Sequence, residues 1–158
     1  MLNIHIIAVG KIKETYYSDA IAEYIKRLTG RCRVQITEIA DERLPVGFSE
    51  AQKNAALEAE GRKIMAACPK NAVLVPLCVE GKQTDSTGFS RLLFSLVERG
   101  TVVFIIGGSH GLSDAVKSAG HTRMSFSKMT LPHRLFRVVL AEQIYRAVEI
   151  ERGTEYHK

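Results

Sequence analysis

The sequence lacks the patterns of a disulfide framework and of a metal site. Its three cysteines, Cys32, Cys68 and Cys78, are scattered and form no C-x-x-C pair. With no signal peptide expected, this odd, unpatterned set favours a reducing cytoplasm over a secreted, disulfide-bonded protein. The five histidines have no ligand spacing with the cysteines or with one another, so we expect no metal.

Long apolar runs are missing too. The longest of them fall far below the roughly 20 residues of a membrane-spanning helix, so we expect a cytoplasmic, soluble protein with no membrane contact. There is no internal repeat, and the loop at 41–48 is too short for a domain linker. A chain of 158 residues predicts one domain over 1–158, which buries roughly 70% of the surface of the unfolded chain.

The charge of the chain permits an anionic partner without requiring one. The net charge is +5 and the pI is about 9.2. The basic excess is greatest near the C-terminal end, at Arg134, Arg137, Arg146, Arg152 and Lys158. Two interpretations stay open for this set: an RNA-facing patch or a solvated helix face.

The hydrophobic pattern alternates between strands and helices. Strands are predicted at 3–9, 33–39, 72–79, 102–106 and 123–126, and helices at 17–28, 49–67, 89–97, 113–119 and 133–151. Ser49 and Gln52 have the spacing of a capping box, and Pro76 predicts a bulge or an edge position for its strand. This alternation favours an α/β, doubly wound and mostly parallel sheet.

A glycine-rich turn follows the most apolar strand. Residues 102–106 have no polar side, as is typical of a strand covered on both faces, and they lead into Gly107-Gly108-Ser109-His110-Gly111. In open α/β sheets, ligands bind beyond the carboxyl ends of the strands. The turn matches neither G-x-G-x-x-G nor G-x-x-x-x-G-K-[ST]. From spacing alone, a ligand site and a tight turn without a ligand are both open.

The last predicted helix, 133–151, is apolar around most of its circumference. Such a helix needs more than one packing partner. A homodimer supplies the second partner, and a helix buried in the centre of a monomer is the alternative. Glu142 and Arg146 are four residues apart and predict an ordinary i,i+4 ion pair.

Several segments together resemble one family over essentially the full length. They are I-I-A-V-G-K-I-K-E at 6–14, I-I-G-G-S-H-G-L at 105–112, S-F-S-K-M-T-L-P-H at 125–133, R-V-V-L-A-E-Q-I-Y-R-A at 137–147 and E-Y-H-K at 155–158. The sequence resembles the RlmH (YbeA-like) family of SPOUT methyltransferases.

The resemblance implies a fold, a cofactor and a substrate. The family has a C-terminal trefoil knot, forms homodimers and binds S-adenosyl-L-methionine in the knot. Its reaction is methylation at N3 of a pseudouridine in a stem-loop of 23S rRNA, within the assembled ribosome. The cofactor residues that it implies here are Leu77, Gly107, Gly108, Ser127, Lys128, Met129, Thr130, Leu131 and Pro132. For Met129, packing in the core remains an alternative.

Methyl transfer to N3 requires removal of a proton, so a base or a cation that stabilises the anion is expected. The candidate catalytic residues are His133, Arg137, Tyr156 and His157. We hypothesise that Tyr156 and His157 of one subunit line the base site of the other. A disordered tail is the alternative for these two, and capping or packing is the alternative for His133.

Two other functions remain open. Related SPOUT enzymes methylate the ribose 2'-O of RNA, and a non-catalytic, ribosome-associated dimer would keep the fold without the reaction. Binding of the cofactor and the position of the methyl group distinguish the three.

Overall fold

A computed structural model describes residues 1–158. Four parallel strands form one sheet in the order β2-β1-β4-β3. The strands are β1 (Leu2–Val9), β2 (Cys32–Ile39), β3 (Val73–Lys82) and β4 (Val102–Ile106). The helices are α1 (Thr15–Leu28), α2 (Glu50–Ala67), α3 (Ser86–Val97), α4 (Asp114–Ala119) and α5 (His133–Glu151). The predicted α/β parallel sheet is confirmed.

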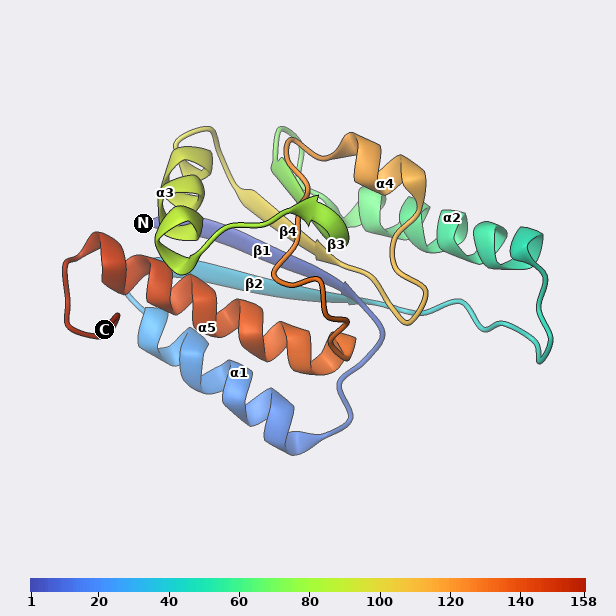
Figure 1. Ribbon diagram of the computed structural model, residues 1–158, viewed down its shortest axis with the longest axis horizontal. Coiled ribbons are helices and arrows are strands. Elements are labelled where there is room, and N and C mark those ends of the chain that lie inside the picture. Colours follow the sequence, from blue (N-terminus) through green and yellow to red (C-terminus); the bar gives the residue numbers. More distant parts are fainter.

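Helices cover both faces of the sheet (Figure 1). Because side chains alternate along a strand, Ile6 and Phe104 pack in the core beneath α1, α3 and α5, whereas Ile7 and Ile105 pack beneath α2 and α4. Both layers consist of buried apolar side chains, which explains why β4 is apolar at every position. The central strands β1 and β4 are buried from both sides.

Local signals placed most elements correctly. The capping box forms: the Ser49 hydroxyl accepts from the Gln52 amide, and the Gln52 side chain accepts from the Ser49 amide. Pro76 lies in β3, which is an edge strand and therefore tolerates a residue without an amide donor.

The predicted fifth strand at 123–126 is wrong. Only Met124 forms bridges, to Leu77 and Lys82, and no strand is built there. Met124 instead lies between Leu77 and Lys82, where β3 curls at its end. Residues on both sides of Met124 bond to one residue: the Lys82 amide donates to the Arg123 carbonyl, and the Ser125 amide donates to the Lys82 carbonyl, both at 3.0 Å.

This passage carries the chain from one face of the sheet to the other. α4 packs with α2, and α5 packs with α1 and α3 on the opposite face. Gly81 makes the passage possible, because a Cβ at this residue would lie 2.3 Å from the Met124 backbone carbon. The crossing brings residues 125–132 to the C-terminal edge of the sheet, beside the ends of β3 and β4.

No helix of the structure has both the length and the apolar composition that crossing a membrane requires.

Candidate functional site

A cavity of about 330 Å³ lies at the C-terminal ends of β3 and β4. Three segments wall it: the end of β3, the glycine turn after β4 and the crossing segment before α5. Parallel strands that end side by side leave such a hollow where their connections diverge. The predicted residues that line it are Leu77, Gly107, Gly108, Ser127, Met129, Thr130, Leu131 and His133.

Two predicted cofactor residues, Lys128 and Pro132, lie outside this lining. Both are exposed and belong to the same loop as their neighbours in the cavity wall. Met129 is 76% exposed, so the interpretation that it packs in the core is wrong. Its side chain is available at the rim of the cavity.

The glycine turn brings bare backbone to the cavity. A Cβ at Gly107 would lie 2.4 Å from the Gly111 carbonyl oxygen, so only glycine fits there. The Gly111 amide closes the turn by donating to the Gly108 carbonyl at 3.1 Å. The segment before α5 that also lines the cavity is likewise held by a hydrogen bond between near neighbours. The Ser127 hydroxyl accepts from the Met129 amide at 2.9 Å.

His133 is the titratable side chain at the junction of the cavity and α5. Burial lowers the pKa of its imidazole, and the nearby Arg137 and Arg134 lower it further. The ring is therefore neutral at physiological pH, where it can accept a hydrogen bond.

Arg137 does not line the cavity. It is 2% exposed and donates to the Glu38 carboxylate at 3.1 Å and to the carbonyls of Val9 and Gly10 at 3.0 and 2.6 Å. These bonds attach the start of α5 to the loop after β1. In this structure its contacts are those of a buried anchor, and its catalytic assignment stays a prediction.

Tyr156 and His157 lie far from the cavity of their own chain. The cavity is at the start of α5 and the tail follows its end, at the opposite edge of the sheet (Figure 1). The 19 residues of α5 span about 28 Å at 1.5 Å per residue.

The tail nevertheless packs on α5. The Tyr156 hydroxyl donates to Glu142, the Arg146 guanidinium bonds to the same carboxylate at 2.7 and 2.9 Å, and Arg146 lies 3.2 Å from His157 Nδ1. The predicted Glu142–Arg146 pair is therefore confirmed. Its contact with the tail was missed, because four-residue spacing carries no information about a segment ten residues further along.

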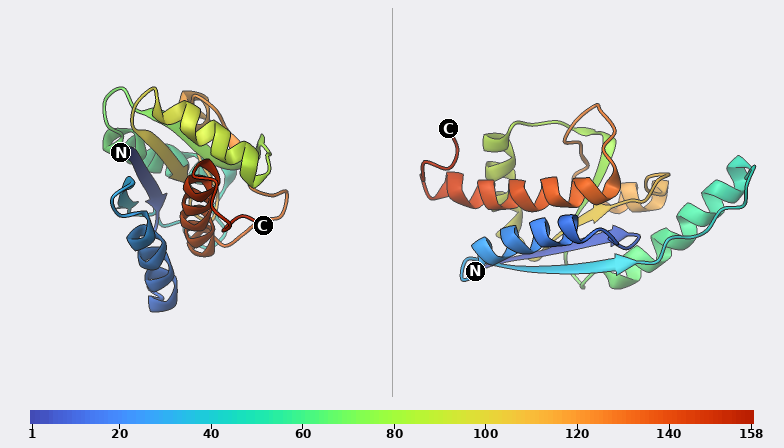
Figure 2. Two further views of the ribbon diagram at one scale, coloured as in Figure 1. Left: turned by 90° about the vertical axis from the view of Figure 1, so that its left-hand side faces the viewer. Right: turned by 90° about the horizontal axis from the view of Figure 1, so that it is seen from below.

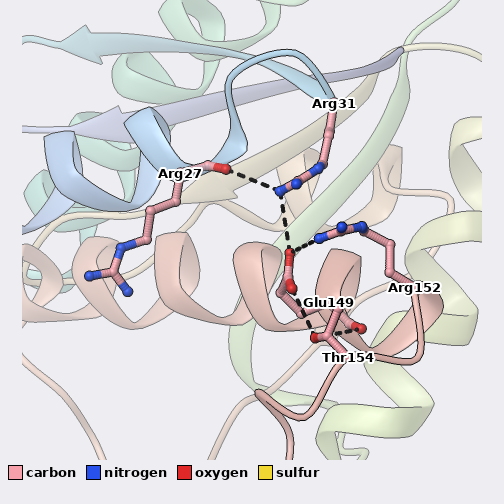
Figure 3. A network of polar contacts seen from close by, with 5 residues as sticks. All are labelled: Arg27, Arg31, Glu149, Arg152 and Thr154. Atoms are coloured by element: carbon pink, nitrogen blue, oxygen red, sulfur yellow. Dashed lines mark hydrogen bonds and ion pairs between the residues drawn. The ribbon is translucent and has the colours of Figure 1, made fainter.

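A second set of contacts fixes the start of the tail (Figure 3). Glu149, 5% exposed, accepts from Arg31 and Arg152 at 3.4 and 2.8 Å and from the Thr154 hydroxyl at 2.8 Å. Burial alone would raise the pKa of this carboxyl, but the bonds from Thr154 and Arg152 outweigh it and hold the pKa below its ordinary value. The tail is thus anchored to the turn between α1 and β2.

The basic residues near the C-terminus are not a free patch. Arg134, Arg137, Arg146, Arg152 and Lys158 each form an ion pair with a glutamate of the same chain, respectively Glu14, Glu38, Glu142, Glu149 and Glu155. No three side chains of His, Cys, Asp or Glu come together as a group that could hold a metal ion.

Comparisons with known proteins agree with this architecture. The family model described as "Predicted SPOUT methyltransferase" matches residues 2–157. A solved structure of a probable methyltransferase from Bordetella pertussis superimposes with a TM-score of 0.59 at 15% identity, over 93% of this chain and 95% of that one. The chain belongs to the SPOUT methyltransferases.

Curated relatives define the family within that class. The ribosomal RNA large subunit methyltransferase H of Leuconostoc mesenteroides is 47% identical over 159 residues, covering 99% of this chain and all of the relative. The protein of the same name from Streptococcus sanguinis is 45% identical over the same share. The chain is a member of the RlmH family.

Proposed function

We propose that this protein transfers a methyl group from S-adenosyl-L-methionine to N3 of a pseudouridine in a 23S rRNA stem-loop, on the assembled ribosome. The observation that carries the proposal is the convergence of three separate segments on one cavity, in a chain whose full-length relatives are named as rRNA methyltransferases. The family supplies the substrate class, and the cavity supplies the place for the cofactor.

The cavity fits the proposed cofactor in size and in chemistry. Small-molecule sites are mostly apolar with a few polar groups, in volumes of about 300–1,000 Å³. Here Leu77, Ile106 and Leu131 give apolar walls for a flat adenine, and the backbone of the glycine turn gives polar groups without charge. When bound, the sulfonium of the cofactor supplies an activated methyl group, so the protein itself has to position the base and remove its proton.

The chain offers two groups for that proton. His133, whose lowered pKa keeps it neutral, lies in the cavity wall and can accept the N3 hydrogen or a hydrogen bond from the base. His157, held by Arg146, belongs to the tail. Because N3 lies between two carbonyls, a cation near these oxygens also favours the anion that forms on deprotonation.

We propose that the site is completed by a second copy of the chain. Within one chain, α5 keeps the tail and the cavity about 28 Å apart. The outward side of α5 carries the half-buried Leu135, Val138 and Val139, followed by Glu142 and Arg146. In a two-fold dimer through this side, with the two helices antiparallel, the tail of each copy approaches His133 of the other.

The passage of Met124 through the curl of β3 supports the trefoil knot that the family implies. Chains rarely thread through their own loops, so a crossing enclosed by Leu77 on one side and Lys82 on the other is unusual. We propose that the chain is knotted here, with 125–132 held at the cavity by the crossing.

RNA docks, in this proposal, on cations at the same edge of the sheet. Five exposed basic residues outside the ion pairs described above end or follow a strand or lie in the crossing segment: Lys11, Lys13, Lys82, Arg123 and Lys128. Phosphate contacts of this kind position a nucleic acid without reading its sequence. Recognition of a folded ribosomal surface by shape and charge requires no separate RNA-binding domain.

The proposal is tested by methyl transfer. Labelled S-adenosyl-L-methionine is incubated with the protein and either assembled ribosomes or naked rRNA from a strain lacking the enzyme, and the modified nucleoside is identified by mass spectrometry. The expected product is N3-methylpseudouridine, formed in assembled particles only. A methyl group on ribose would support 2'-O transfer instead. No transfer despite cofactor binding would leave the non-catalytic, ribosome-associated dimer.

A further inference from the structure

A second cavity, of about 490 Å³, adjoins the first. It lies between the 41–48 part of the loop from β2 to α2, residue Glu60 of α2, and the glycine turn. Figure 2 shows α2 and this loop projecting together past the C-terminal edge of the sheet. Gly108, Ser109 and His110 line both cavities. A ligand in the first cavity therefore has the second as its immediate neighbour.

Glu60 is a buried carboxylate with an unused acceptor. It is 8% exposed, and its Oε2 atom is buried with no hydrogen-bond partner. The nearby Lys63 forms its own ion pair with Glu42 at 2.5 Å. Burial raises the pKa of Glu60, and Asp41 and Glu42 raise it further. An unsatisfied carboxyl oxygen in this environment is unfavourable unless a ligand donates to it.

In the first cavity, no carboxylate is free to pair with a cation. Its one acidic lining residue, Glu80, is exposed and already forms an ion pair with Lys117. The proposed methyl donor carries an α-ammonium group at the amino acid end, remote from its adenine. Such a group bound in the first cavity alone would be left without an anionic partner. The second cavity has three acidic residues, Asp41, Glu42 and Glu60.

We propose that the second cavity binds the amino acid end of the methyl donor, and that the carboxylate of Glu60 accepts a hydrogen bond from its α-ammonium group. This inference rests on the proposed function, because it takes the cofactor of the first cavity as given. Arg43, which also lines the second cavity, suits the α-carboxylate of the same ligand. The glycine turn then lies between adenosine and amino acid, and Gly108, which lines both cavities and has no side chain, lets the ligand pass from one cavity to the other.

Calorimetric titration with two ligands tests this assignment. S-adenosylhomocysteine has the amino acid end, whereas 5'-methylthioadenosine has the adenosine part without it. In Glu60→Gln the affinity for S-adenosylhomocysteine should fall about 10- to 100-fold, the loss expected for a hydrogen bond between charged groups. The affinity for 5'-methylthioadenosine should be unchanged. Glu58→Gln, an exposed position on the same helix, should alter neither.

The other outcomes overturn the proposal in distinguishable ways. An equal loss for both ligands would mean that Glu60 supports the fold of the first cavity and does not contact the amino acid end. An unchanged affinity for both would mean that Glu60 has no contact with the cofactor, while the cofactor site itself stands. If the wild-type protein binds neither ligand, the cofactor assignment fails and this inference with it. Glu60→Ala, with its folding checked by circular dichroism, should reproduce the result of Glu60→Gln.

Discussion

The hydroxyl of Tyr156 donates a hydrogen bond to Oε1 of Glu142 across 3.1 Å, which joins the last turn of the chain to the middle of α5. Arg146 binds the same carboxylate, and its guanidinium lies 4.7 Å from the centre of the Tyr156 ring. The tail is therefore ordered within one chain, contrary to the alternative of a disordered segment. The site that we propose presents this ordered tail to a second copy.

Tyr156 should act as a hydrogen-bond donor and not as a base. Burial, followed by the bond to Glu142, raises the pKa of its hydroxyl to about 12, so it keeps its proton at neutral pH. Tyr156→Phe loses one bond to a charged group and should lower the rate of methyl transfer about 10- to 100-fold. Cofactor affinity, measured by calorimetry, should not change. A fully active Tyr156→Phe would remove the hydroxyl from the mechanism.

Glu149 should determine how firmly the tail is held. Its lowered pKa means that its stabilising contribution is present above the ordinary carboxyl pKa of 4.5 and is lost as the pH falls through the lowered value. Glu149→Gln removes the ion pairs with Arg31 and Arg152, and trypsin should then cleave after Arg152 about 10-fold faster at neutral pH, because local opening is easier. The exposed Glu151 gives a control, since Glu151→Gln should leave the rate unchanged. Equal rates for all three proteins would show that these contacts do not hold the tail.

The elements that could be predicted from the sequence are those determined by residues that are close to one another in the sequence. The capping box at Ser49 and Gln52 forms because both partners lie within one turn, and the strand at 102–106 is buried because all five of its residues are apolar. The segment 123–126 is not a strand because its partner, β3, curls around it, and that geometry depends on the path of the whole chain.

The candidate site likewise has parts that the sequence predicts and parts that it does not. The three segments of the first cavity could be expected together, because carboxyl ends of parallel strands meet at one edge. The second cavity and the buried carboxylate of Glu60 could not, because a glutamate in a helix of mixed composition gives no sign of burial. Nor could the anchoring of Arg137, whose partners Val9 and Gly10 are more than a hundred residues away.

Gly81 should be essential for the crossing. Gly81→Ala would put a Cβ against the Met124 backbone, which cannot move freely because it is bonded to β3 on both sides. We expect a loss of about 1–3 kcal/mol or more in the free energy of unfolding, as for overpacking in a tight interior. Chemical denaturation measures this change. The neighbouring Glu80→Ala should change stability by no more than about 0.5 kcal/mol, because its ion pair is exposed. Similar small effects for both would mean that the passage is loose.

The ionised side chain of Glu60 should lower the stability of the folded protein at neutral pH. Because its pKa is raised in the folded state, folding is most favoured below the ordinary carboxyl pKa of 4.5, and this advantage is lost as the pH rises through the raised value. Glu60→Gln cannot ionise and should therefore melt at a higher temperature than the wild type at pH 7, with the difference shrinking towards pH 4. Thermal melts across this range measure the effect. A Glu60→Gln protein that is less stable at pH 7 would show that the carboxylate is stabilising.

The central claim is a site shared between two copies of the chain, and mixed dimers test it most directly. One variant lacks the tail, residues 154–158, and the other is Thr130→Trp, which fills the cavity from an exposed position in its wall. Each alone should be inactive. A mixed dimer contains one intact cavity facing one intact tail, so equal mixing after dissociation should restore about a quarter of wild-type methyl transfer to ribosomes, given random pairing of subunits. Mixtures that stay inactive, although mixed dimers form, would contradict the shared site.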